Sequence, residues 1–142
     1  MLIKNDCKDK MNNAEKVFNL FRAILGGENE VDRDKEHFWI LGVNTKLRIK
    51  YIELVSLGIL DKVVVHPREV FRMAVMQGVS SIILVHNHPG GDPEPSEDDK
   101  RLTKALNDSG KIIDINILDH VIIGDSFFSF REERLILEGN HV

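Results

Sequence analysis

The chain has 142 residues, a formal net charge of −4 and a hydrophobic content of 42%. That length favours a single domain that buries roughly two-thirds of the surface of its unfolded chain. The acidic balance and the lack of a dense lysine and arginine stripe give no indication of a nucleic-acid partner.

The single cysteine, Cys7, excludes an internal disulfide and is typical of a reducing, cytoplasmic setting. The first sixteen residues contain no apolar segment of signal-peptide length. The longest apolar runs, such as residues 82–85, are far too short to span a bilayer. We therefore expect a cytoplasmic protein with no membrane partner.

Residues 1–35 are expected to hold a polar tail, one helix and a charged connector. Asn12 or Asn13 can cap the helix, because a short polar side chain accepts a hydrogen bond from a backbone N–H of the first turn. The glycine pair at residues 26–27 ends the helix, and the charged residues 28–35 form the connector.

Residues 36–142 are expected to form the main domain. Apolar runs predict strands in this region, at residues 38–43, 49–57, 63–65, 81–86, 112–118, 120–123 and 127–130. Two further helices are expected at residues 67–78 and 96–109, the second followed by Gly110. The strand at 81–86 is apolar on both sides, which indicates a central strand with both faces covered. The predicted fold is mixed α/β of α+β character, with a mostly antiparallel or mixed sheet and about three flanking helices.

The most informative segment is residues 86–99, which read His-Asn-His-Pro-Gly-Gly-Asp-Pro-Glu-Pro-Ser-Glu-Asp-Asp. His86 and His88 project to the same side of an extended chain, because side chains alternate along a strand. Asp99 can supply a third ligand if the intervening loop folds back. Two imidazoles and one carboxylate, with a fourth position open for water, are typical of a catalytic zinc site rather than a structural one.

Ser96 lies three residues before Asp99, and two interpretations of this pair stay open. Ser-x-x-Asp is a helix capping box, in which both side chains satisfy exposed backbone N–H groups. Beside the two histidines, Ser96 could also donate its hydroxyl to the oxyanion formed when water adds to a carbonyl, a contact typically worth about 2.7–4 kcal/mol. Such a hydrolase also needs a carboxylate that accepts the proton of the water.

The other histidines are weaker candidates. His120 lies in a predicted strand and can either line a pocket or form a hydrogen bond in the core, of which the core role is favoured. His37 carries no functional signal in the sequence.

The pattern His-x-His-Pro, six residues, Ser-x-x-Asp within residues 86–99 resembles the metal motif of the JAMM (MPN/JAB) metalloprotease superfamily. The wording of this segment is similar to the bacterial RadC-like branch. Val-His-Pro-Arg-Glu at residues 65–69 and Leu-Asp-His-Val-Ile-Ile-Gly at residues 118–124 carry the same resemblance, which covers residues 36–131. The resemblance implies a JAB/MPN-like, cytidine-deaminase-like architecture.

The resemblance also implies that His86, His88 and Asp99 bind Zn²⁺ and that Ser96 assists the reaction. The catalytic glutamate of the superfamily precedes the first core strand, and Glu36 occupies the matching place in this sequence. Other glutamates compete for the role of the base, with Glu53 second and Glu28 and Glu30 behind it.

The implied function is that of a zinc-dependent hydrolase, which cleaves a peptide or isopeptide bond of a protein or peptide substrate by metal-activated water. Full-length RadC-like proteins also resemble a fusion to an N-terminal module of the helix-hairpin-helix type, and the chain is expected to be a short form that lacks it. The alternative function is a non-catalytic MPN-type interaction module associated with DNA repair. The sequence gives no indication of the oligomeric state.

Overall fold

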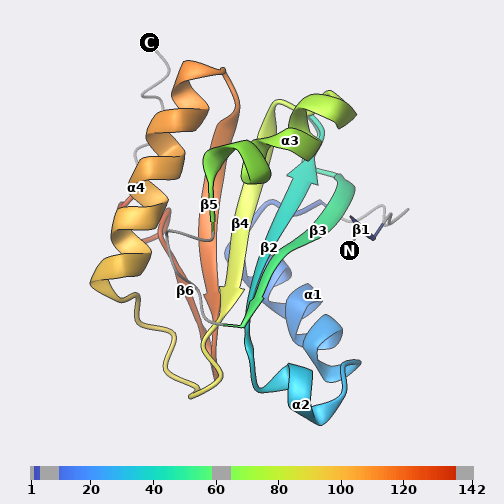
Figure 1. The fold of residues 1–142 in the computed structure, drawn as a ribbon, viewed down its shortest axis with the longest axis vertical. Helices are drawn as coiled ribbons and strands as arrows, with labels where there is room; N and C mark the ends of the chain where they lie inside the picture. Colours follow the sequence, from blue (N-terminus) through green and yellow to red (C-terminus); the bar gives the residue numbers. More distant parts are fainter. Residues whose placement is uncertain (1, 4–9, 59–64, 137–142) are drawn as a thin grey trace.

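Six strands and four helices make up the described part of the chain, residues 2–3, 10–58 and 65–136 of a computed structural model (Figure 1). Cys7 lies outside these residues. The strands are β1 (Leu2–Ile3), β2 (Glu36–Val43), β3 (Ile49–Gly58), β4 (Ser81–Asn87), β5 (Asn116–Ile123) and β6 (Phe127–Ser129). The helices are α1 (Ala14–Gly26), α2 (Glu30–Arg33), α3 (Pro67–Gln77) and α4 (Glu97–Ile112). The described strands form one sheet in the order β1-β3-β2-β4-β5-β6, in which β4 and β5 are parallel and the other pairs antiparallel. The predicted mixed α/β class is confirmed.

Strand β4 lies in the middle of the sheet, between β2 and β5. His86 of β4 is opposite Phe38 of β2 and opposite Ile122 of β5. Successive apolar residues of β4 enter two separate cores, Ile82 and Leu84 on one face and Ile83 and Val85 on the other. The prediction of a central strand covered on both faces is therefore confirmed.

Helix α1 covers one face of the sheet (Figure 1). Asn13 caps its first turn, because its side chain accepts a hydrogen bond from the backbone N–H of Lys16 at 2.9 Å. Val17 and Phe21 are buried, and the ring of Phe21 lies 4.9 Å from that of Trp39 on β2. The helix predicted within residues 1–35 is confirmed, because it has both a polar cap at its start and buried apolar residues at helical spacing.

Helices α3 and α4 cover the opposite face. Pro67 stands in the first turn of α3, and Gly78 ends this helix at φ 68, a left-handed conformation that glycine adopts without strain. Phe71 of α3 and Leu106 of α4 belong to the same buried cluster. No helix in the described part of the chain has the length and apolar character that crossing a membrane requires.

Helix α4 is longer than the sequence predicts. Gly110, expected to follow the helix, lies inside it, because α4 continues to Ile112. A Cβ atom at Gly110 would lie 2.5 Å from the backbone oxygen of Ile115 and 3.2 Å from the ring of Phe71. The helix end predicted at Gly110 is wrong, since this glycine permits a close approach of α4 to its neighbours instead.

The two strands predicted at residues 112–118 and 120–123 form one strand, β5, which begins only at Asn116. The register against β4 shifts by one residue at Leu118, so the strand continues through Asp119. The break predicted at Asp119 is wrong, because its buried carboxylate has hydrogen-bond partners that let a polar residue stay within a strand.

The predicted connector at residues 28–35 contains a short helix, α2. Asn29 caps it, since its side-chain oxygen accepts the backbone N–H of Asp32 at 2.8 Å. The strand predicted at 63–65 lies mostly outside the described residues, and Val65 is buried without belonging to a strand.

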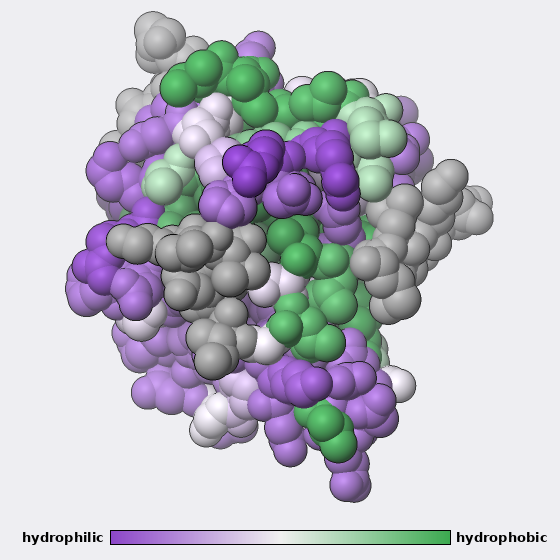
Figure 2. Space-filling view, viewed as in Figure 1, coloured by the Kyte–Doolittle hydropathy of each residue, from purple (hydrophilic) through white to green (hydrophobic). Residues whose placement is uncertain are grey.

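Exposed apolar side chains gather where α3 and α4 end, at Val75, Met76, Ile112 and Ile113. Figure 2 shows apolar surface at this upper end of the molecule. The first residues of β4 and β5, Ser81 opposite Asn116, follow closely on these helix ends. The carboxyl end of β4, with residues 86–88, therefore lies at the other end of the sheet.

Substitution of Gly42 should destabilise the fold. A Cβ atom at Gly42 of β2 would collide with the buried ring of Tyr51 on β3, so Gly42→Ala should lower the free energy of unfolding by about 1–3 kcal/mol. Gly26→Ala is the matched control, because a Cβ there meets nothing within 4 Å, and it should be neutral or stabilising by about 0.4–1 kcal/mol. Equal urea midpoints for the two variants would contradict this packing.

Candidate metal centre

Three side chains from two elements meet at the end of β4. His86 lies in β4, His88 directly follows the strand, and Asp99 lies in the first turn of α4. The Nε2 atoms of His86 and His88 are 3.0 Å apart. Oxygens of the Asp99 carboxylate lie 3.4 Å from His86 Nε2 and 3.2 Å from His88 Nε2. One ligand atom of each residue lies within 4.8 Å of the other two, which is close enough for a shared metal ion.

Backbone contacts hold the loop after β4 against the turn between β5 and β6. The N–H of His88 donates to the backbone oxygen of Ile123 at 2.8 Å, just beyond the end of β4. The loop then turns at Gly91, with φ 99, and the carbonyl of Gly91 accepts the N–H of Asp125 at 2.7 Å. A Cβ atom at Gly124 would collide with that carbonyl. Two glycines therefore let the loop pack against the β5–β6 turn.

A reciprocal capping box closes the N-terminus of α4. Ser96 Oγ accepts the N–H of Asp99 at 3.0 Å, and Asp99 Oδ2 accepts the N–H of Ser96 at 2.9 Å. Oδ2 is also the atom that lies 3.2 Å from His88 Nε2. The Asp99 carboxylate thus takes part both in the predicted capping box and in the cluster with the two histidines.

Burial and hydrogen bonding set the charges of these three side chains. Burial lowers the pKa of His86, which is fully enclosed. A hydrogen bond with Asp99 raises the pKa of His88 above its ordinary value of 6.5. Burial alone would raise the pKa of Asp99, but hydrogen bonds with His86 and His88 outweigh it and hold that pKa well below its usual range. A proton in this cluster is therefore favoured on His88 over His86.

A contact on the side of His88 that faces away from His86 and Asp99 orients its ring for a cation. Its Nδ1 lies 2.9 Å from the backbone oxygen of Asp92, an atom that can only accept. Nδ1 therefore carries a hydrogen, and a neutral His88 directs the lone pair of Nε2 toward His86 and Asp99. Two imidazole nitrogens and one carboxylate are a donor set that zinc and similar divalent ions prefer, so the residues fit a metal ion.

Glu36, the predicted base, begins β2 near this cluster and is half-buried. Phe38, two residues later, pairs with His86 in the antiparallel ladder, so Glu36 is level with His88 in the register. Burial and the hydrogen bonds with Asp99 have the larger effects on the pKa values of His86 and His88. The negative charge of Glu36 adds a smaller effect, which raises the pKa of both histidines. The structure therefore brings Glu36 close to the histidine pair.

The competing glutamates have other surroundings. Glu53 is buried on β3, where burial raises its pKa, and it lies 3.9 Å from Arg72 of α3. Glu28 binds a histidine outside the cluster, and Glu30 is exposed in the first turn of α2. Of these four glutamates, Glu36 has a charge that raises the pKa of both histidines.

Asn87, between the two histidines, holds the backbone on both sides of Glu36. Its Oδ1 accepts the N–H of His37 at 2.6 Å, and its Nδ2 donates to the backbone oxygen of Lys35 at 3.1 Å. The buried ring of His37 contacts the same oxygen of Lys35 at 2.8 Å and Glu28 at 2.6 Å. Sequence reasoning missed Asn87 and His37, because these bonds exist only once β2 and β4 are neighbours.

His120 lies directly behind His86, with its Nε2 2.6 Å from His86 Nδ1. Both rings are fully buried. Burial holds the pKa of His120 well below its usual range, so this ring is neutral. The favoured core position of His120 is confirmed, and that position is also in contact with a candidate ligand.

A mixed sheet whose central strand ends beside two histidines, with a helix-borne aspartate next to them, defines a JAB-type domain with a possible metal site. The family model described as RadC-like JAB domain matches residues 11–135. The chain belongs to this family.

Relatives of the chain carry the name UPF0758 protein. One from Chlorobaculum parvum is 44% identical over 128 residues, which is 89% of this chain and 55% of the relative. One from Desulforudis audaxviator is 51% identical over 96 residues, or 68% of this chain and 42% of the relative. One from Methanococcoides burtonii is 42% identical over 136 residues, or 95% of this chain and 57% of the relative. The chain thus spans about half the length of these curated relatives.

The opposite pKa shifts of the two histidines should be measurable in the metal-free protein. We expect His88 to titrate above pH 6.5 and His86 below it, because the Asp99 carboxylate favours the charged form of His88 and burial disfavours that of His86. Asp99→Asn should lower the midpoint of His88, since the negative charge is lost. NMR shifts of the ring carbons against pH measure both midpoints. One shared midpoint, or no response to Asp99→Asn, would contradict these charges.

Proposed function

We propose that the chain is a metal-dependent hydrolase that uses Zn²⁺ to cleave a peptide or isopeptide bond. The convergence of His86, His88 and Asp99 within 4.8 Å carries this proposal, because these residues would hold the ion. Membership of the RadC-like JAB domain family supports it. The relatives' name specifies no substrate. The proposed substrate class is a protein or peptide.

Glu36 is proposed to be the base. When bound, Zn²⁺ supplies a Lewis acid and lowers the pKa of a bound water to about 7. In this proposal Glu36 accepts a proton from the attacking water and delivers it to the leaving nitrogen. The effect of its charge on both histidines supports this role. The two bonds from Asn87 to the flanking backbone support it as well, because a base needs a fixed position.

Ser96 is proposed to stabilise the oxyanion that forms when water adds to the substrate carbonyl. Its oxygen is held by the N–H of Asp99, and this bond does not use the hydroxyl hydrogen. The residue is exposed, so a substrate can reach it from solvent. The N-terminus of α4 also favours negative charge at this point. A hydroxyl donor and a helix terminus would therefore act on the same developing charge.

Removal of one ligand should remove the metal. Wild-type protein should bind about one Zn²⁺ per chain, and Asp99→Ala should weaken binding by more than about a hundredfold, beyond the loss typical of outer partners. Asp98→Ala is the matched control, because Asp98 is exposed on the same helix and pairs with Arg101. Elemental analysis and calorimetric titration measure both effects. Equal zinc binding by wild type and by His86→Ala/His88→Ala would contradict the assignment.

Loss of the proposed base should separate catalysis from metal binding. Glu36→Gln should keep its zinc and lose about 10²–10⁴-fold in kcat, because the water loses its proton acceptor. Hydrolysis of a panel of fluorogenic peptide and isopeptide substrates, with zinc content measured on the same samples, tests this. Glu30→Gln is the surface control, and Glu53→Gln tests the second candidate.

Two outcomes of this series would count against Glu36. Loss of activity in Glu53→Gln with full activity in Glu36→Gln would move the base to β3. If cells that carry Glu36→Gln keep the wild-type phenotype, the non-catalytic interaction module is favoured instead.

A further inference from the structure

A chain of buried hydrogen bonds lies behind the ring of His86. Nδ1 of His86 is 2.6 Å from Nε2 of His120, and Nδ1 of His120 is 2.6 Å from Oγ1 of Thr103. Oγ1 of Thr103 is in turn 2.7 Å from the backbone oxygen of Asp99. The two histidines are fully buried and Thr103 is 2% exposed, so solvent does not compete for these bonds.

One atom sets the direction of every bond in this chain. The backbone oxygen of Asp99 can only accept, so the hydroxyl of Thr103 donates to it. Thr103 Oγ1 then accepts the Nδ1 hydrogen of His120, which leaves a lone pair on His120 Nε2. That lone pair accepts the Nδ1 hydrogen of His86. A neutral His86 therefore keeps the lone pair of Nε2, the atom that lies 3.0 Å from His88 Nε2.

We propose that His120 and Thr103 are positioning residues for the metal ion. They hold His86 in the one tautomer that leaves Nε2 able to bind a cation. They also join this ligand of β4 to the α4 backbone that carries Asp99. This role rests on the proposed function, since it treats His86 as a ligand. Neither positioning residue is itself a ligand, and both act through His86.

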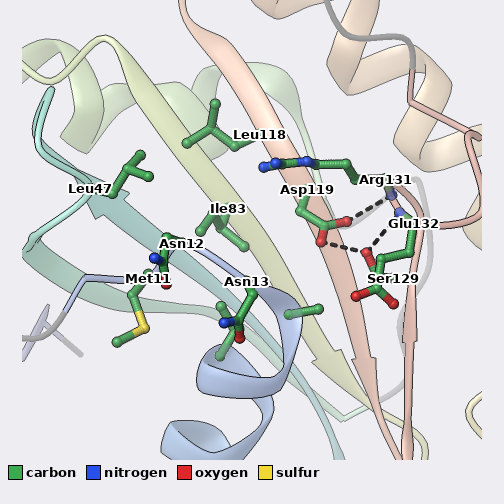
Figure 3. A pocket seen from close by; sticks show the side chains of 12 residues that line it. Met11, Asn12, Asn13, Leu47, Ile83, Leu118, Asp119, Ser129, Arg131 and Glu132 are labelled. Carbon is green, nitrogen blue, oxygen red and sulfur yellow. Dashed lines mark hydrogen bonds between the residues drawn. The ribbon is translucent and has the colours of Figure 1, made fainter.

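His120 is held from both faces of β5. The ring of Phe130 stacks on it, with centroids 4.7 Å apart and an interplanar angle of 11°. Asp119 points to the other face, where it accepts the hydroxyl of Ser129 at 2.6 Å and the N–H of Arg131 at 3.0 Å (Figure 3). Asp119 thereby binds the two residues that flank Phe130, Ser129 through its hydroxyl and Arg131 through its backbone N–H. The contact between His120 and His86 is thus supported on one face of β5 by Phe130, and on the other face by the bonds of Asp119 to the neighbours of Phe130.

Four variants separate the positioning role from a general loss of packing. His120→Leu removes both ring nitrogens, whereas His120→Gln keeps an amide that can accept from His86 Nδ1. Thr103→Val removes only the hydroxyl at the end of the chain. Ser109→Ala is the matched control, because Ser109 Oγ donates to the carbonyl of Ala105, four residues earlier on the same helix, at 2.9 Å and outside the network.

Two measurements read the tautomer and the metal site independently. In the metal-free wild-type protein, two-bond ¹H–¹⁵N correlation spectra should show the hydrogen of His86 on Nδ1. His120→Leu should introduce the Nε2–H form and weaken zinc binding by about 10–100-fold in competition with a chelator. Thr103→Val should cause a smaller loss in the same direction. His120→Gln should recover most of the affinity, and Ser109→Ala should match wild type.

The following results overturn the assignment: wild-type zinc affinity in folded His120→Leu, or a His86 of the Nε2–H form in the wild-type protein. If His120→Leu does not fold, Thr103→Val decides, and zinc affinity equal to that of Ser109→Ala overturns the role. Wild-type protein that binds no zinc but keeps His86 as the Nδ1–H form overturns the proposed function and upholds the hydrogen-bond direction.

Discussion

The electrostatics of three closely spaced ligand atoms is the constraint on which the site depends. His86 Nε2, His88 Nε2 and the Asp99 carboxylate all present electron pairs to one small volume. Groups of this kind cannot share a volume shielded from water unless a proton or a cation lies between them. The three side chains must therefore be held in place by contacts on the sides that face away from this volume.

These outer contacts come from ordinary elements of the fold. The carbonyl of Asp92 orients His88, the capping box with Ser96 orients Asp99, and β5 supplies His120 behind His86. These three contacts lie in the loop, at the start of α4 and between β4 and β5, and each of them also orients one candidate ligand. A strand end on a central strand suits such a site, because rigid backbone is present and side chains still reach solvent.

The candidate ligands could be named from the sequence, whereas their outer partners could not. The His-x-His spacing matches the period of a strand, and Ser-x-x-Asp matches the first turn of a helix, so both are local patterns. His120 is 34 residues from His86 and 17 from Thr103, and no local pattern links them. Gly110 misled the helix prediction for a related reason: a glycine that ends a helix and one that permits close packing look alike in a sequence.

By itself, the sequence determined what is encoded over a few residues: a helix start at Asn12 or Asn13, a second helix start at Ser96, the apolar strand that carries His86, and the ligand spacing. Only the tertiary structure decided which glutamate lies beside the histidines and which side chains support them. The reason is physical. Strands β2, β4 and β5 become neighbours through pairing between distant parts of the chain, and the surroundings of Glu36 and His120 arise only from that pairing.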